Sequence, residues 1–253
     1  MNRLPPPRSS RRTLPRHRPA GLRIPPGYHG RAPGLAPELL CRAGYALSHD
    51  AVNKVPAWVA NHLTAGRMEG TVARTNDSRA DPDLAPGERS ELGDYQGSGF
   101  DRGHMAPARA MAWSRRAMSE SFLLSNMAPQ VGVGFNRGIW RVLEGLVRAW
   151  TRERGDLYVV TGPIYPDAGG AGAGRTIWPN RVAVPTHFYK VIFDLVRVEA
   201  LAFILPNAKL RTADLPSYLT SVDEVEHRTG LDFLPALNDA VEALVEAAVP
   251  TQV

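Results

Sequence analysis

The residues Asp101-Arg102-Gly103-His104 form the densest group of chemically useful side chains in the sequence. An acid, a guanidinium and an imidazole lie within one tetrapeptide, with glycines before it and Pro107 after it. An imidazole with its ordinary pKa of ~6.5 is largely neutral at physiological pH, so it can accept a proton. The group is therefore a candidate for proton-transfer chemistry. Alone it does not establish a site, because such a tetrapeptide also arises by chance and a lone loop histidine is commonly structural.

Polar residues at three later positions could serve the same site, although each also has an ordinary structural role. Asn126 lies in the block Ser125-Asn126-Met127-Ala128-Pro129-Gln130 and could be only a turn former before the proline. Asn136 precedes an amphipathic stretch, where asparagine commonly caps a helix, and a cap residue can also bind a ligand. Glu144 could be a solvated helix carboxylate that pairs with an arginine one turn away. The order and spacing of the blocks must decide between these interpretations.

Together the blocks resemble the DNA/RNA non-specific endonucleases of the His-Me finger (ββα-metal) superfamily, the group that includes endonuclease G. The resemblance begins with the tetrapeptide, Asn126 and Asn136, and includes the helix that contains Trp140 and Glu144. It is specific because several separate blocks agree, and it covers roughly residues 40–235. The further blocks are Thr161-Gly162-Pro163-Ile164-Tyr165, Val184-Pro185-Thr186-His187-Phe188-Tyr189-Lys190-Val191, and Val222-Asp223-Glu224-Val225-Glu226 up to Thr229-Gly230-Leu231.

This resemblance implies a sugar-non-specific endonuclease that hydrolyses phosphodiester bonds of DNA and RNA and leaves 5′-phosphate ends. It identifies His104 as the general base that activates the attacking water, a step for which a neutral imidazole is suited. It identifies Asn136 as the direct protein ligand of a single divalent ion, and Glu144 as a residue that contacts the ion through water. A neutral amide oxygen suits Mg²⁺, which keeps several waters and takes other ligands from substrate phosphate. Mn²⁺ is expected as a substitute.

The same resemblance gives supporting roles to other residues. Asp101 and Arg102 are expected to brace the site and the phosphate, and Asn126 matches an asparagine that supports the site. A further family arginine binds phosphate from the preceding loop. Arg74 and Arg79 both lie near its place, and spacing alone does not decide between them, so we name Arg79 as the preferred candidate.

Arg137 departs from the family pattern, because close relatives usually have glutamine after the metal-binding asparagine. An arginine beside Asn136 adds repulsion toward a cation, but it can equally clasp a phosphate. The sequence leaves open how this residue affects metal affinity or substrate preference.

Two other functions are compatible with the same sequence. One is a catalytically weak nuclease-like module that binds nucleic acid or a partner protein, since a fold can outlive its chemistry. The intact pair of His104 and Asn136 argues against it. The other is a phosphodiesterase that acts on small esters or on one kind of nucleic acid only.

The strand pattern predicts an α+β domain whose central sheet is mainly antiparallel, with flanking helices and a ββα-metal unit that contains the site. Strand-like runs lie at residues 157–161, 188–193 and 200–205, and the last two are close enough to pair antiparallel. Residues 40–47 and 55–63 flank a polar turn. They predict either an early hairpin or a strand followed by a short helix.

Helices and one long loop are predicted between and after these strands. Residues 137–150 place apolar side chains at helical spacing and predict an amphipathic helix, and residues 113–122 predict a shorter one. Ser221 with Glu224 forms a capping box before a helix that Gly230 can end. A last helix is expected from about residue 237 to 248. Residues 74–91 are polar and proline-containing, which predicts a long surface loop.

Composition limits the class of protein and its partners. The chain has 253 residues, of which 43% are hydrophobic, and this suffices for a core without disulfides. Its single cysteine excludes an internal disulfide and a thiolate zinc site. There is no run of about 18 apolar residues that would predict a membrane-spanning helix, so no membrane partner is expected, and the compartment stays undetermined. Many relatives form dimers, and a host must contain such an activity, so a second copy and an inhibitor protein are candidate partners beside DNA and RNA.

Residues 1–37 differ in composition from the rest of the chain and are predicted to be a disordered tail before a nuclease domain at 38–253. They contain eight arginines, no acidic residue and nine of the 22 prolines, which oppose a helix and an apolar core. The tail thus contributes +8 to the net charge of +5, and the remaining 22 basic and 25 acidic residues contribute −3. The basic balance of the chain is therefore no argument for a cationic groove in the folded part.

Overall fold

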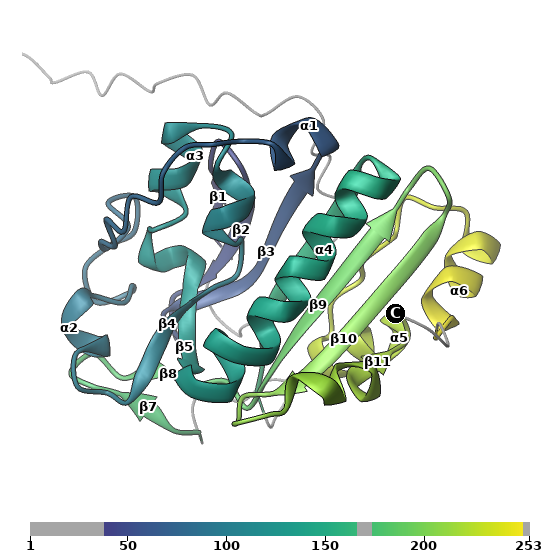
Figure 1. The fold of residues 1–253 in the computed structure, drawn as a ribbon. Coiled ribbons are helices and arrows are strands. Elements are labelled where there is room, and N and C mark those ends of the chain that lie inside the picture. Colours follow the sequence, from purple (N-terminus) through teal and green to yellow (C-terminus); the bar gives the residue numbers. More distant parts are fainter. Residues whose placement is uncertain (1–37, 166–173, 250–253) are drawn as a thin grey trace, which may run out of the picture.

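The computed structural model describes residues 38–165 and 174–249, and its main element is a seven-stranded sheet in the order β1-β2-β3-β6-β9-β10-β11 (Figure 1). Every neighbouring pair in this sheet is antiparallel. The predicted tail, residues 1–37, lies outside the described residues. The strands are β1 (Glu38–Cys41), β2 (Ala46–Asp50), β3 (Val55–Leu63), β6 (Leu157–Ile164), β9 (His187–Asp194), β10 (Glu199–Pro206) and β11 (Leu219–Thr220).

Helices and two short strand pairs complete the fold. β4 (Phe100–His104) pairs with β5 (Met127–Val131), and β7 (Thr176–Ile177) pairs with β8 (Val182–Ala183). The predicted α+β class, with a mainly antiparallel sheet and flanking helices, is confirmed. The helices are α1 (Ala65–Met68), α2 (Leu92–Tyr95), α3 (Arg115–Glu120), α4 (Arg141–Arg154), α5 (Val222–Thr229) and α6 (Asp239–Ala247), with 3₁₀ turns at Ala108–Met111, Leu124–Asn126 and Thr212–Tyr218 and a π-helical segment at Gly132–Trp140.

The strand pairings follow the sequence patterns. β9 and β10 pair antiparallel from Asp194 opposite Glu199 to His187 opposite Pro206, as predicted for this region. Of the two alternatives for the early segment, the hairpin is the one found, because β2 and β3 pair directly. Nearly every side chain of β9 is buried. Both faces of the sheet are covered, so β9 is largely apolar, with Lys190 as a buried polar exception.

Each face of the sheet packs against a different layer. On one face, Ile192 of β9 belongs to the same apolar cluster as Leu143 of α4 and residues of β4 and β5. On the other face, Val191 of β9 packs in a cluster with Val225 of α5. The sheet thus separates the layer of α4, β4 and β5 from the layer of α5 and α6, as Figure 1 shows.

The segment before α4 differs from the prediction. The sequence predicts a helix over 137–150, whereas the regular α-helix spans Arg141–Arg154 and follows the π-helical segment. Within that segment Gly134 has a φ of 87°, which favours glycine, and Gly138 has φ −117° and ψ −112°. These two residues interrupt regular helical geometry. Asn136 is therefore held in a wide, irregular turn and not in the first turn of an α-helix.

The other predicted elements lie close to their expected positions. The helix expected at 113–122 is α3, and the helix expected at 237–248 is α6. Ser221 Oγ accepts a hydrogen bond from Glu224 N at 3.1 Å, and Gly230, with a φ of 68°, ends α5. The loop at 74–91 contains no helix or strand apart from one bridge residue. Among the described residues, none of the helices has the length and apolar character that a membrane crossing requires.

Candidate active site

A pocket of about 550 Å³ lies where β4, α2, the π-helical segment and the loop at 74–91 meet. His104 and Asn136 both line it, together with Asp101 and Arg102 of β4 and Arg74 of the loop. All five residues were named from the sequence, and they come from three separate segments of the chain. Asn126, Glu144 and Arg79 are not among the residues that line it.

His104 is the last residue of β4, and close packing of the preceding Gly103 and of its own ring fixes its position. The preceding Gly103 faces the buried side chain of Gln130 on β5, where an added Cβ would lie 2.1 Å from that side chain. Glycine is therefore required between Arg102 and His104. The imidazole also meets the ring of Phe122 edge to face, with 5.0 Å between ring centroids.

The surroundings of His104 oppose a positive charge. Burial and the nearby guanidinium of Arg74 lower the pKa of His104 to about 3. A hydrogen bond with the backbone of Arg102 acts in the opposite direction, which means that the ring donates to that carbonyl. The Nε2 atom has no hydrogen-bond partner among the described residues. The ring is thus neutral at pH 7 and keeps one nitrogen able to accept a proton.

Asn136 is oriented by Asp101. Its Nδ2 donates to Asp101 Oδ2 at 2.9 Å, and the same carboxylate oxygen lies 3.0 Å from Arg137 Nε. The preceding Phe135 stacks on Trp140 and contacts Phe188 of β9, which anchors this turn to the sheet. Asp101 therefore fixes the amide of Asn136 and also balances the charge of Arg137.

This arrangement fits a hard divalent cation. Because the amide nitrogen of Asn136 is committed to Asp101, the amide oxygen is the atom left to bind a ligand. Amide oxygen is a ligand type that Mg²⁺ accepts, with most of its shell left to water and phosphate. Arg137 is directed to Asp101 and its side chain is 65% exposed, so its charge is partly neutralised and screened.

Arg74 and Arg79 lie in different surroundings, although both are in the loop that precedes β4. Arg74 lines the pocket, and its guanidinium carbon lies 4.7 Å from the centroid of the Phe122 ring. Arg79 instead donates to the carboxylate of Asp77 and to the carbonyl of Ser119, each at 3.0–3.1 Å. The structure therefore brings Arg74, and not the preferred candidate Arg79, to the pocket.

Asn126 is fully buried and supports the chain that follows His104. Its Oδ1 accepts from Ala106 N at 2.9 Å, and its Nδ2 donates to Ala106 O at 3.0 Å and to Ser121 O at 2.9 Å. Its backbone carbonyl accepts from Met105 N. The side chain thus makes hydrogen bonds to buried backbone groups of Ala106 and Ser121. These bonds position the loop after β4.

Glu144 lies on α4 in a group of charged residues beside the pocket. Burial raises the pKa of Glu144, while the positive charges of Lys190, Arg148 and Arg74 lower it. Glu144 therefore interacts electrostatically with Arg74, which lines the pocket. The expected contact of Glu144 with an ion through water stays a prediction.

Lys190 and Arg148 were not singled out from the sequence as site residues. Lys190 on β9 is 1% exposed, and its ammonium donates to Thr161 Oγ1 at 2.6 Å and lies 4.7 Å from the Trp140 ring centroid. Burial lowers the pKa of Lys190 to about 8, against the attraction of Glu144. A lysine inside an otherwise apolar strand run was the signal that could have identified it.

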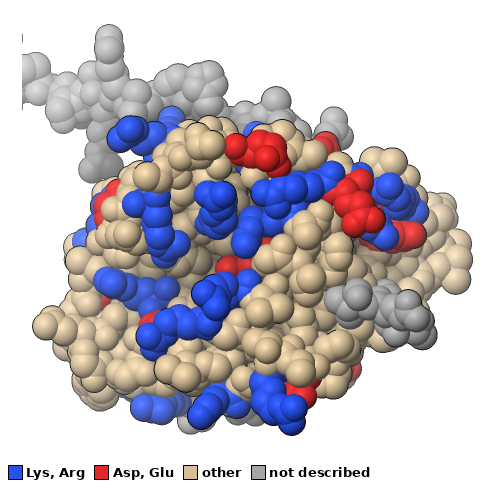
Figure 2. All heavy atoms as spheres, viewed as in Figure 1, with Lys and Arg blue, Asp and Glu red and all other residues tan. Residues whose placement is uncertain are grey.

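Basic side chains gather on the face that carries α3, α4 and β4 (Figure 2). Arg74 and Arg102 line the pocket, while Arg148 lies near enough to Arg109 and Arg152 that burial and these charges lower its pKa. The folded part thus carries many basic side chains on this face although residues 38–253 have a net charge of −3. Such a surface attracts a phosphate backbone.

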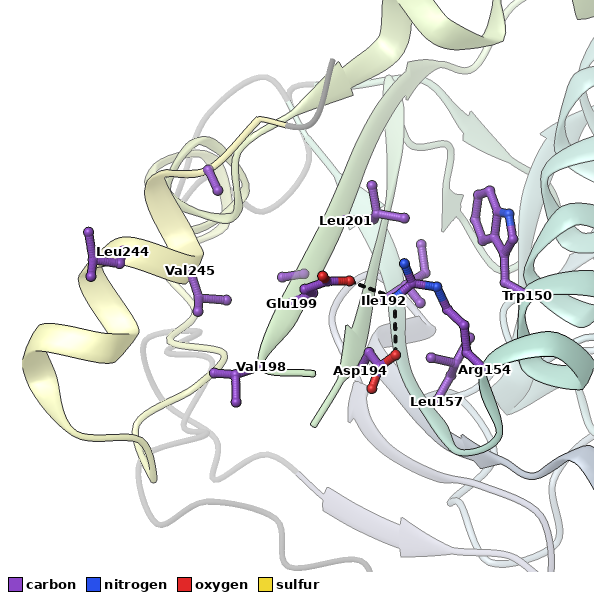
Figure 3. A pocket seen from close by; sticks show the side chains of 12 residues that line it. Trp150, Arg154, Leu157, Ile192, Asp194, Val198, Glu199, Leu201, Leu244 and Val245 are labelled. Atoms are coloured by element: carbon purple, nitrogen blue, oxygen red, sulfur yellow. Dashed lines mark hydrogen bonds and ion pairs between the residues drawn. The ribbon is translucent and has the colours of Figure 1, made fainter. Parts of the chain in front are cut away.

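A second pocket, also of about 550 Å³, lies between the end of α4, the β9–β10 hairpin and α6 (Figure 3). Its lining is largely apolar, and its main charges are already paired: Arg154 lies 3.0 Å from Asp194 and 2.6 Å from Glu199. None of the candidate catalytic residues lines it. The pocket with His104 and Asn136 is therefore the candidate active site.

Comparison with known proteins identifies the family of the chain. A family model for DNA/RNA non-specific endonucleases matches residues 27–240. Nuclease C1 of Cunninghamella echinulata var. echinulata is 42% identical over 217 residues, which cover 81% of this chain and 86% of that protein. Human mitochondrial endonuclease G is 38% identical over 213 residues, covering 80% and 71%.

A solved structure agrees with the sequence relatives. The crystal structure of an EndoG/EndoGI complex, described as showing the mechanism of EndoG inhibition, matches with a TM-score of 0.74 and 38% identity. The match covers 81% of this chain and 89% of that chain. Fold, pocket and relatives lead to one conclusion: the chain belongs to the family of DNA/RNA non-specific endonucleases.

Proposed function

We propose that this endonuclease hydrolyses phosphodiester bonds of DNA and RNA with His104 as the general base and one Mg²⁺ ion bound by Asn136, and that Mn²⁺ can replace Mg²⁺. The observation that carries the proposal is that His104 and Asn136 line the same pocket. The products would carry 5′-phosphate ends. Because the pocket offers guanidinium and amide groups to phosphate, and phosphate contacts do not identify the base, little sequence preference is expected.

His104 would take the proton of the attacking water at Nε2. The ring is neutral at pH 7, and its bond to the Arg102 carbonyl keeps the other nitrogen protonated. Arg74 and Arg102 would bind the phosphate and balance the charge that develops on its oxygens. The ion, when bound, would stabilise the departing 3′ oxygen.

The remaining residues would position these groups. Asp101 would orient the amide of Asn136, and Glu144 would contact the ion through water, held at the pocket edge by the surrounding cations. Asn126 would support the loop after His104. We propose Arg74 in place of Arg79 as the phosphate-binding arginine of the loop, because the guanidinium of Arg79 is bonded to Asp77 and Ser119.

An inhibitor protein and a second copy of the chain are proposed as partners. Support for the first is that the similar solved structure is a complex of EndoG with EndoGI and describes EndoG inhibition. An inhibitor that covers the pocket rim would meet the arginine-rich face, so an acidic inhibitor surface is expected. Size measurement with light scattering would test the dimer.

Cleavage of supercoiled plasmid tests the proposed reaction. Wild type is incubated with Mg²⁺ and with Mg²⁺ plus a chelator, beside His104→Ala and the matched control His62→Ala. General-base assistance contributes about 10²–10⁴ in rate. We therefore expect His104→Ala to lose about that factor while remaining folded by circular dichroism, and His62→Ala to cut normally.

The same assay separates the alternatives. Protein that leaves the plasmid uncut with and without Mg²⁺ but retards it in a gel is a binding module and not a nuclease. Undiminished cutting by His104→Ala would refute the role of that residue. Comparison of plasmid, single-stranded DNA, RNA and a chromogenic phosphodiester then tests the breadth of the substrates.

A further inference from the structure

The helix α6 buries a carboxylate and exposes its leucine. Glu246 is 6% exposed and is the only residue of α6 that is classed as buried, whereas Leu244 on the same helix is 76% exposed. A helix of nine residues is not stable alone, so α6 depends on what it docks against. Apolar packing of α6 onto the sheet layer is limited, with Val245 only partly buried against the core. Glu246 is therefore the side chain of α6 that lies deepest in the fold.

Glu246 faces other carboxylates and no cation. Oxygen atoms of Asp223, Glu226 and Glu246 lie within 4.8 Å of one another, and the same holds for Asp232, Glu242 and Glu246. Glu246 belongs to both sets, which come from α5, the following loop and α6. None of the ion pairs in the described part of the chain includes any of these five carboxylates.

One buried oxygen of this cluster has no partner. Glu226 Oε1 accepts from Phe233 N at 2.8 Å, and the side chains of Glu226 and Glu246 share a hydrogen bond. The remaining oxygen, Glu246 Oε1, is buried without a hydrogen-bond partner among the described residues. Burial and the neighbouring acids raise the pKa of Glu246 to about 8. A buried, unpartnered carboxylate oxygen is costly unless a ligand satisfies it.

We propose that the carboxylates of Glu226, Glu246, Asp223, Asp232 and Glu242 form a second cation site, which binds one Ca²⁺ ion and fastens α6 to α5. This site lies on the face of the sheet opposite to His104, in the layer of α5 and α6. Binding replaces the proton that Glu226 and Glu246 share, and the proton passes to solvent. The site is independent of the proposed cleavage chemistry.

The chemistry of the cluster selects Ca²⁺. Ca²⁺ takes six to eight oxygen ligands at about 2.3–2.6 Å, so ligands on opposite sides of the ion are about 4.6–5.2 Å apart. The oxygens of each set, which lie within 4.8 Å of one another, fit inside that shell. Mg²⁺ is usually held by only one or two carboxylates in a strict octahedron, whereas two sets of three carboxylates that share Glu246 suit the larger ion.

Calorimetric titration with CaCl₂ tests the proposal in a chain whose proposed catalytic metal ligand is removed. The background variant is Asn136→Ala, so that any ion bound beside His104 does not contribute. We expect one Ca²⁺ per chain in Asn136→Ala, and a loss of at least tenfold in affinity when Glu246→Gln or Glu226→Gln is added. The matched control adds Glu224→Gln, an exposed acid on α5 outside the cluster, and should bind as tightly as the background.

Thermal unfolding supplies a second readout. A ligand that binds only the folded state raises its stability, so Ca²⁺ should raise the Tm of Asn136→Ala and of the Glu224→Gln control but not of the Glu246→Gln chain. Absence of Ca²⁺ binding by Asn136→Ala, or equal binding after Glu246→Gln and Glu226→Gln, overturns the proposal. Because Glu246→Gln in the otherwise unchanged chain should still cut plasmid with Mg²⁺, either failure leaves the nuclease assignment untouched.

Discussion

His104 has surroundings that disfavour its protonated form, and this has a consequence for stability. In the folded chain its pKa is about 3, whereas an unfolded histidine has ~6.5. Above pH ~6.5 neither state is protonated and the residue has no effect. Between pH ~6.5 and 3 only the unfolded state binds the proton, so folding becomes progressively less favourable as the pH falls.

Replacement of this histidine should therefore stabilise the chain in acid relative to wild type. At pH 5, about 1.5 pH units below the unfolded pKa, the effect amounts to about 2 kcal/mol. The quantity to compare is the free energy of unfolding of His104→Gln minus that of wild type. We expect this difference to be about 2 kcal/mol larger at pH 5 than at pH 7.5. Urea unfolding without divalent ions measures it, and groups that titrate equally in both chains do not contribute to the difference. A difference that does not change with pH contradicts the assigned environment.

The two loop arginines should differ sharply in their effect on cleavage. Arg74 lines the pocket, and loss of a charge-assisted bond to phosphate costs about 1.5–3 kcal/mol, which is roughly 10–100-fold in kcat/KM. Arg79→Ala should change kcat/KM only a few-fold, because its guanidinium is bonded within the loop. Steady-state cleavage of a labelled oligonucleotide compares Arg74→Ala with Arg79→Ala as its matched control. The reverse order would restore Arg79 as the phosphate ligand.

Residue types and block order were enough to predict that His104 and Asn136 serve one site, and the structure places both in one pocket. Their catalytic roles stay predictions. The sequence named both Arg74 and Arg79 for the phosphate and could not decide between them, because a long loop fixes no spacing. In the structure Arg74 lines the pocket, whereas Arg79 is bonded to Asp77 and Ser119. Lys190 was missed because its partner Glu144 is distant in the sequence.

At the scale of elements, α4 and β9 are linked by a buried pair of charges. Lys190 on β9 lies under α4 and attracts Glu144, and removal of this cation would leave the carboxylate buried without it. Without Lys190, burial raises the pKa of Glu144 further. A higher pKa means a larger protonated fraction, and a protonated carboxyl has no charge with which to hold the water shell of an ion.

We therefore expect Lys190→Met to increase the Mg²⁺ concentration needed for half-maximal cleavage. The variant Glu144→Gln should give a similar increase, and the double variant should be no worse than either single one, because both remove the same interaction. Metal titration of the initial cleavage rate measures all three. Additive losses in the double variant would show that Lys190 acts only through packing, for instance against Trp140 and Thr161.

Periodicity predicted the strands and helices well, but not the turn that carries Asn136. The apolar residues Ile139 and Trp140 keep helical spacing, so the sequence pattern extends through a region that is not a regular helix. The interruption depends on the torsions of Gly134 and Gly138. A hydrophobic pattern contains no information on backbone torsions. A glycine permits unusual torsions but does not require them. The start of α4 was therefore predicted four residues too early.

At the scale of the whole molecule, the pocket and all residues proposed for cleavage lie within residues 38–253. The eight arginines of residues 1–37 add charge, while the described residues that line the pocket all lie between Arg74 and Asn136. We expect a chain of residues 38–253 to keep the kcat of the full chain for plasmid at saturating Mg²⁺. Any contribution of the arginines should appear in KM and weaken with salt, because phosphate contacts release counterions.

Kinetics of both chains at about 50 and 200 mM salt would measure this. A shortened chain that folds but loses kcat would show that residues 1–37 take part in the reaction itself. If the shortened chain keeps its kcat, the charge on the face that carries the pocket, and not the net charge of the chain, governs the approach to the substrate. Sequence composition could not reveal this, since Arg74 and Arg102 are far apart in the chain and meet only in the pocket. Other basic side chains gather on the same face of the fold (Figure 2).

The seven-stranded sheet keeps His104 and Asn136 on one side and α5 with α6 on the other. A bead, a surface or a fused reporter joined through the outer side of α6 would consequently leave the pocket open to bulk solution. Long polymers could still reach it without steric hindrance from the attachment. The outer side of α6 is therefore a suitable attachment point for immobilised or tagged forms of the nuclease.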